Sequence, residues 1–305
     1  MAEVSPRLRA RRGLRRLMFL GARSVLRGVG FARAGALGRF LGELQYRLGG
    51  KARRRMQAEI ALALGRPTED PAVPPMLREA CRVNTAAVLE IMAMLDRRQD
   101  EAMLVERAEL EGLEHLRAAL SEGRGAIVMA AHMGNAALVP LCLANAGWPV
   151  SVLYKESRMM SADFFLAGLE RYGIQGIAAN AGLRAYGQML AALKQGRIVF
   201  LMLDQGVKHA KDGQVHRFLG KDMPMPAGPA QLARAARAPV VPAATLAATP
   251  RWRFALQPPI RLGEASLESD VATLVKATER NVLAQPQLWS WTQRRWRKFA
   301  PAALP

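Results

Sequence analysis

The chain has 305 residues, of which 50% are hydrophobic, and it carries 44 Lys and Arg against 25 Asp and Glu, a formal net charge of +19. This length and apolar content are enough to bury a core, which excludes an intrinsically disordered protein. Its two cysteines, Cys81 and Cys142, have no metal-ligand spacing and cannot build a disulfide framework, so we expect the bulk of the chain on the reducing, cytoplasmic side. The positive charge predicts an anionic partner.

The charge is concentrated at the two ends of the chain. Residues 1–55 contain fifteen Arg or Lys against Glu3 and Glu43, and a second basic segment occupies residues 294–298. Between residues 14 and 48 the arginines alternate with large apolar side chains, a pattern typical of helices that lie on an anionic lipid surface. Nucleic acid would also attract such segments, but no nucleic-acid-binding motif accompanies them. We therefore predict a membrane surface as the partner and no nucleic acid.

The first hundred residues are predicted to be helical. Residues 8–96 favour helices, with a break where four prolines cluster between Pro67 and Pro75. A signal peptide is a poor fit, because Arg23 and Arg27 interrupt the apolar stretch. We expect residues 1–50 to be basic amphipathic membrane-associating helices, residues 51–104 to pack on the core, and residues 105–305 to form an α/β domain.

A run from Ala126 to Tyr154 contains no Asp, Glu, Lys or Arg, which is long enough for a membrane-spanning helix. Its turn residues favour a different interpretation. We predict a strand over 126–131, a turn over 132–135, a helix over 136–146 and a strand over 150–154, so that a buried parallel pair explains the continuous hydrophobicity.

The rest of the chain repeats this alternation of strands and helices. Further strands are predicted over 197–203, 238–246 and 252–260, and helices over 162–171, 182–195, 228–236 and 268–284. The predicted fold class is α/β, with a central mixed, largely parallel sheet flanked by helices behind the basic helical N-terminal region.

His132 follows the first of these buried strands and precedes a helix. Open α/β sheets place their active sites at that end of their strands, which makes His132 a candidate general base. A histidine in apolar surroundings can equally be a hydrogen-bonded core residue, so position alone does not decide between the two roles.

Several motifs around and after His132 resemble the bacterial lipid A biosynthesis (lauroyl/myristoyl) acyltransferase family, within the lysophospholipid acyltransferase superfamily. The resemblance covers residues 50–299 and its motifs come in the expected order. They are the run Gly123 to Asn135 with Leu110 to His115 before it, Arg171-Tyr-Gly173, Asp204-Gln205-Gly206, Phe218-Leu-Gly220 with Gly228-Pro229, Ala238 to Pro242, and Trp289-Ser-Trp291 with the basic segment after it.

The resemblance implies transfer of a fatty acyl group from an acyl carrier protein or coenzyme A thioester to a hydroxyl of an anionic membrane lipid, at the cytoplasmic face of the inner membrane. His132 would be the general base, and backbone N–H groups near Gly134 and Asn135, or Arg171, would stabilise the oxyanion. No metal or redox cofactor is required. The remaining candidate substrate-binding residues are Lys155, Arg158, Asp204, Gln205, Phe218 and Gly228.

One position departs from the superfamily pattern, in which an Asp or Glu stands five positions after the histidine. That position is Ala137, and no carboxylate occurs between Glu122 and Glu156. Because loss of the orienting acid costs other histidine-based catalytic groups on the order of 10⁴ in turnover, we expect this chain to be impaired.

Three explanations for Ala137 stay open. The chain is an acid-to-alanine variant of an active enzyme, or a divergent enzyme in which Glu156, Asp163 or Asp204 orients His132, or a non-catalytic homologue that binds lipid or an acyl carrier. The acceptor stays open as well among lipid A precursor, lysophospholipid, ornithine-type lipid and glycolipid, and so does the length of the acyl chain.

Overall fold

The computed structural model describes residues 6–97, 101–155, 162–207, 213–293 and 295. Nine strands form within these residues. They are β1 (Ala108–Glu111), β2 (Ala126–Ala130), β3 (Val150–Tyr154), β4 (Gln175–Ala178), β5 (Ile198–Met202), β6 (Gln214–Phe218), β7 (Lys221–Met225), β8 (Val240–Ala247) and β9 (Trp252–Leu256). Seven of them build one sheet in the order β1-β9-β8-β2-β5-β3-β4, and β6 and β7 form a separate antiparallel hairpin.

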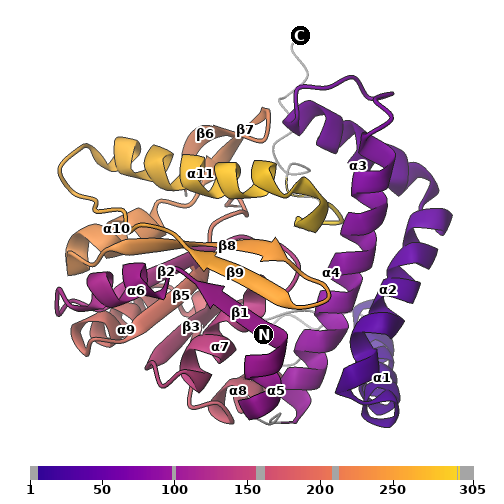
Figure 1. The fold of residues 1–305 in the computed structure, drawn as a ribbon, viewed down its shortest axis with the longest axis horizontal. Helices are drawn as coiled ribbons and strands as arrows, with labels where there is room; N and C mark the ends of the chain where they lie inside the picture. Colours follow the sequence, from indigo (N-terminus) through magenta and orange to yellow (C-terminus); the bar gives the residue numbers. More distant parts are fainter. Residues whose placement is uncertain (1–5, 98–100, 156–161, 208–212, 294, 296–305) are drawn as a thin grey trace.

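Helices cover the sheet, and a further group of helices lies beside one end of it (Figure 1). Four of them, α1 to α4, stand together on one side of the molecule, while α11 crosses a face of the sheet. The helices are α1 (Pro6–Val29), α2 (Phe31–Leu48), α3 (Gly50–Ala63), α4 (Val73–Asp96), α5 (Glu101–Arg107), α6 (Leu113–Leu120), α7 (Val139–Asn145), α8 (Ala162–Glu170), α9 (Leu183–Lys194), α10 (Gly228–Ala236) and α11 (Leu267–Ala284), with the short 3-10 turns η1 (Ala136–Leu138), η2 (Ala179–Ala181) and η4 (Pro286–Leu288).

The fold class predicted from the sequence is confirmed. All neighbouring strands in the large sheet are parallel except β8 and β9, so the sheet is mixed and largely parallel. The charge-free run from Ala126 to Tyr154 consists of β2, a turn, η1, α7 and β3, as expected. Within the described residues, no helix combines the length and the apolar character that crossing a bilayer requires.

The two strands of that run were expected to pair with each other, and this expectation was wrong. Strand β5 lies between β2 and β3 and is parallel to both. The continuous hydrophobicity of β2 is explained, as expected, by its burial in a parallel sheet, since both of its faces are covered. Ile127 and Met129 face one hydrophobic core, whereas Val128 and Ala130 face the other.

Other differences have local causes. Strand β9 ends four residues earlier than expected, because Pro258 and Pro259 follow it and cannot continue a ladder of hydrogen bonds. The short strands β1 and β4 and the β6–β7 hairpin were not predicted. None of the residues of β1 is buried, so this strand has no apolar alternation to reveal it.

Helix α2 lies unusually close to α4. A Cβ atom on Gly38 would come within 2.4 Å of the Cα of Ala86, and one on Gly42 within 2.3 Å of the carbonyl oxygen of Cys81. Since nothing larger than glycine fits at these two positions, the small residues of α2 set the distance between the helices. The break between α3 and α4 falls at the predicted prolines.

A buried carboxylate ties α1 to the end of α4. Asp96, the last residue of α4, accepts hydrogen bonds from the guanidinium groups of Arg23 and Arg27 at 2.5 and 2.6 Å. Some of the arginines counted above as a lipid-binding surface therefore hold the N-terminal helices on the core.

Candidate active site

His132 and Asp204 are brought together by the pairing of β2 with β5. In this parallel ladder Ala130 of β2 pairs with Met202 of β5. His132 lies two positions after Ala130, and Asp204 lies two positions after Met202. Because both residues lie the same number of positions beyond paired residues of two adjacent parallel strands, they lie at the same edge of the sheet. Nδ1 of His132 lies 2.6 Å from Oδ1 of Asp204, although 72 residues separate them in the sequence.

The Asp204 carboxylate is fully buried and has hydrogen-bond partners at both of its oxygens. Its Oδ2 receives the backbone N–H of His132 at 3.1 Å, Nε1 of Trp289 at 2.8 Å and the guanidinium of Arg295 at 2.7 Å. Burial would raise the pKa of Asp204, but the neighbouring charges of His132 and Arg295 and these hydrogen bonds outweigh it and hold the pKa below its usual range. Asp204 is therefore a carboxylate that stays ionised and cannot rotate.

The other face of the imidazole is open. The His132 side chain is 33% exposed, and its Nε2 lies 3.4 Å from Nε2 of Gln205, which donates to Oε1 of Gln293 at 2.8 Å. A carboxylate on Nδ1 favours the tautomer with the proton on Nδ1, which leaves a lone pair on Nε2. This lone pair faces the Gln205 amide and the open side of the site.

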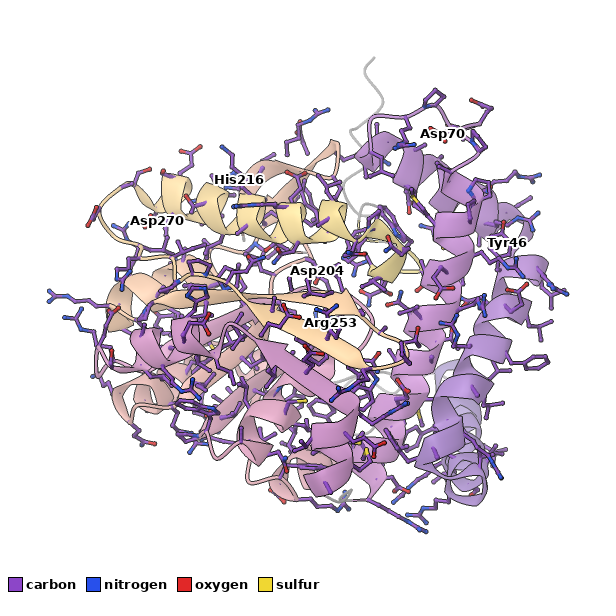
Figure 2. All side chains as sticks on the ribbon, in the orientation of Figure 1. Tyr46, Asp70, Asp204, His216, Arg253 and Asp270 are labelled. Carbon is purple, nitrogen blue, oxygen red and sulfur yellow. The ribbon has the colours of Figure 1, made fainter. Side chains whose placement is uncertain are left out.

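The segment after α11 fixes the turn that carries His132. Met133 and Trp289 form an antiparallel bridge, with Ser290 donating to the carbonyl of His132 at 3.0 Å. On α4, Asn84 donates to the carbonyl oxygens of Leu288 and Trp289. The turn after β2, the segment after α11 and helix α4 are therefore tied together around His132. Figure 2 shows Asp204 near the centre of the view.

One of the expected oxyanion donors, the backbone N–H of Gly134, is engaged elsewhere, which is a correction. The backbone N–H of Gly134 donates to the carbonyl of Leu288 at 2.8 Å. The Asn135 side chain is buried and donates to Oε2 of Glu90 at 2.6 Å. Both contacts shape the turn, and the oxyanion role of the Asn135 backbone N–H stays a prediction.

Arg171 contacts the end of α4. Its guanidinium donates to the carbonyl of Leu95 in the last turn of α4, where a cation satisfies the helix end. This contact is structural, and the role of Arg171 toward the oxyanion stays a prediction.

The other expected substrate-binding residues have mixed positions. Lys155 is exposed directly after β3, and Gly228 begins α10 with open space around it. Phe218 is buried and packs edge-on against Trp289, with ring centroids 6.1 Å apart, so it supports the site from behind. Arg158 lies outside the described residues.

Ala137 lies in η1, half-buried, on the turn that follows Asn135. Of the carboxylates considered for the missing acid, Asp204 contacts His132, Asp163 is exposed at the start of α8, and Glu156 lies outside the described residues.

Sequence reasoning missed two charged residues of this site. Glu90 on α4 is 4% exposed and accepts hydrogen bonds from Asn135, Trp252 and Arg107. Burial raises the pKa of Glu90 in spite of these contacts. Arg295 was counted with the basic segment at residues 294–298, but it is buried against Asp204. An acid at a core-facing position of an amphipathic helix was the available signal for Glu90.

A cavity of about 340 Å³ lies at the opposite edge of the sheet, before β2 and β8. Arg124, Arg234, Arg237 and Arg261 line it, and two of these pair with acids, Arg261 with Glu122 at 2.6 Å and Arg234 with Asp270. Figure 2 shows Asp270 at one end of α11, well away from Asp204 in the centre. This cavity is not part of the His132 site.

Comparison with known proteins relates the chain to lipid acyltransferases. The chain is 26% identical over 187 residues to phosphatidylinositol mannoside acyltransferases from two strains of Mycobacterium tuberculosis, with 61% of the chain and 58% of those proteins covered. The match thus spans less than two thirds of these relatives. A phosphatidylinositol mannoside acyltransferase from Mycolicibacterium smegmatis is 24% identical over 244 residues, 79% of each chain. The family model described as bacterial lipid A biosynthesis acyltransferase matches residues 1–298, and the chain belongs to that family.

Proposed function

We propose that this protein transfers a fatty acyl group from a thioester to a hydroxyl of a membrane lipid, with His132 as general base. The observation that supports this most directly is the short contact between Nδ1 of His132 and the buried carboxylate of Asp204, with Nε2 left open. Membership of an acyltransferase family gives the reaction class. The direct test is conversion of a lipid acceptor to its acylated product, followed by mass spectrometry with acyl carrier protein and coenzyme A thioesters as alternative donors.

In this reaction the acceptor hydroxyl lies against Nε2 of His132, where the Gln205 amide now lies. The hydroxyl oxygen attacks the thioester carbonyl carbon while its proton passes to Nε2. The C–S bond then breaks, the thiolate leaves and takes the proton back from the imidazolium, and the new ester bond remains. Asp204 stabilises the imidazolium between these two steps, and Gln205 offers an amide N–H donor to the oxyanion.

Of the three explanations for Ala137, the geometry favours a divergent enzyme in which Asp204 orients His132. Impairment was expected because no acid stands at position 137. Asp204 supplies a carboxylate to Nδ1 from a neighbouring strand, so that reason no longer applies. We infer that the chain is active as it stands.

Placing an acid at position 137 separates the explanations. For Ala137→Glu we expect the rate of acyl transfer to change less than about tenfold, because Nδ1 of His132 already has a carboxylate partner. The measurement is kcat for the two folded chains, with Ala137→Gln as a control for side-chain size. A rise of a hundredfold or more in the Glu variant alone would show instead that the chain lacks its orienting acid.

The acceptor that we propose is a phosphate-bearing glycolipid or lysolipid, such as a lipid A precursor. The relatives named above act on phosphatidylinositol mannoside, which also carries a phosphate and sugar hydroxyls. Exposed Lys155, just beyond β3 at the same edge of the sheet as His132, would suit an anionic headgroup.

The N-terminal helices would hold this site at the cytoplasmic face of the inner membrane. Phe40, Leu44 and Leu48 follow one another at four-residue intervals on α2 and are 66%, 43% and 75% exposed. They point away from the glycine positions that contact α4, and Arg33, Arg47, Lys51 and Arg54 are exposed beside them. An apolar ridge among cations matches an anionic lipid surface.

Charging this ridge tests the membrane proposal. We expect Phe40→Glu with Leu44→Glu to weaken co-sedimentation with anionic vesicles by at least about tenfold, because two apolar side chains leave the lipid and two anions meet it. Leu183→Glu, at a 90% exposed position on α9, serves as the matched control and should leave binding unchanged. Stronger retention of the unmodified chain by duplex DNA than by vesicles at physiological salt would contradict the proposal.

A second candidate function is a non-catalytic homologue that binds lipid or an acyl carrier, which the alanine at position 137 favours if Asp204 does not serve as the orienting acid. Lipid that co-purifies with the protein, identified by mass spectrometry and then offered with a donor, distinguishes the two. An enzyme converts that lipid to its acylated form, and a binding protein releases it unchanged.

A further inference from the structure

Arg295 is a buried cation next to the general base. Only 2% of its side chain is exposed, and its guanidinium lies 4.0 Å from the centre of the Trp289 ring. It donates to the Ser290 carbonyl and to Oδ2 of Asp204, while its Nε has no hydrogen-bond partner. Burying a charge without satisfying all of its donors is costly, and packing alone would be served better by an apolar side chain.

Arg295 and His132 share one carboxylate. Oδ1 of Asp204 faces the imidazole at 2.6 Å, and Oδ2 faces the guanidinium at 2.7 Å. The Asp204 carboxylate by itself stabilises the imidazolium form of His132 through the attraction of opposite charges. A fixed cation on the far oxygen offsets part of that stabilisation and favours the neutral imidazole.

The other charged groups around this pair are arranged behind Arg295. Glu59 on α3 faces Arg295, with Arg55 on the same helix and Lys221 on β7 near Glu59. Burial lowers the pKa of Arg295, whereas the charges of Asp204 and Glu59 oppose that change. On the open side of the imidazole, the neutral amides of Gln205 and Gln293 are the neighbours.

We propose that Arg295 is a positioning residue that sets the proton affinity of His132 through Asp204, so that the general base is a linked unit of imidazole, carboxylate and guanidinium. This proposal rests on the proposed role of His132. It predicts that removing the cation, rather than removing a hydrogen bond, makes His132 hold its proton to higher pH.

The test follows the titration of the His132 imidazole by NMR in protein labelled with ¹⁵N at histidine. The chain has 4 histidines, and His132→Gln assigns the signal. We expect Arg295→Gln, which keeps an N–H donor but no charge, to move the titration midpoint up by about one pH unit. Arg295→Lys should restore it, and the acid limb of the kcat/KM profile should move in the same direction in each variant.

Trp289→Phe is the matched control, because it removes another donor to the same Oδ2 without changing charge. It should lower kcat and leave the midpoint within a few tenths of a unit. If Arg295→Gln does not fold by circular dichroism, Arg295→Met, whose stem fits against the Trp289 ring, replaces it with the same expected shift.

Equal midpoints for the unmodified chain and both uncharged variants would overturn the proposal, as would equal shifts in the Trp289 and Arg295 variants. The midpoint is read without substrate. A shift in a chain that transfers no acyl group would therefore uphold the link between Arg295 and His132 while refuting the proposed function.

Discussion

Acyl transfer is expected to fall by about 10⁴-fold when His132 is replaced with Ala, because a neutral hydroxyl is a weak nucleophile and no other described side chain stands ready to take its proton. The Nε2 atom is the open basic position at this edge of the sheet, with the Gln205 amide beside it. The measurement is kcat with saturating thioester donor and lipid acceptor.

The control for this variant is His115→Ala. His115 lies on α6, which precedes β2 and so lies at the edge of the sheet opposite His132. Its loss should change the rate less than twofold. A His132→Ala chain that is folded and retains more than a tenth of the rate would remove His132 from the role of general base.

Replacing Asp204 with Asn is expected to lower kcat by about 10³- to 10⁴-fold with little change in the binding of lipid. Three N–H donors, from His132, Trp289 and Arg295, converge on Oδ2. The Asn carbonyl oxygen must take that position to accept them, which turns the amide NH₂ toward Nδ1 of His132. The imidazole then carries its proton on Nε2, the wrong tautomer for a base.

Asp163→Asn is the matched control, since this exposed acid on α8 was the other described carboxylate considered as the orienting acid. Its rate should be unchanged. A full rate in Asp204→Asn, combined with a large gain in Ala137→Glu, would return the orienting role to position 137.

Much of the fold was predictable because its strands are buried on both faces and its breaks are prolines and glycines. The strands at 126–130, 150–154 and 198–202 and the helix at 228–236 were predicted to within a residue. The missing elements were short and half-exposed, such as β1 and β4, where neither apolar alternation nor a long apolar run is present.

The sequence by itself determined the α/β class, the position of His132 at a strand end, and the family. It also indicated that the acid five positions later was absent. Only the tertiary structure decided which carboxylate contacts His132, because the contact between His132 and Asp204 depends on the order of strands, with β5 rather than β3 beside β2. Likewise, Arg295 belongs to a basic segment in the sequence, yet it is buried in the structure, because Asp204 offers a charge that compensates for its loss of water.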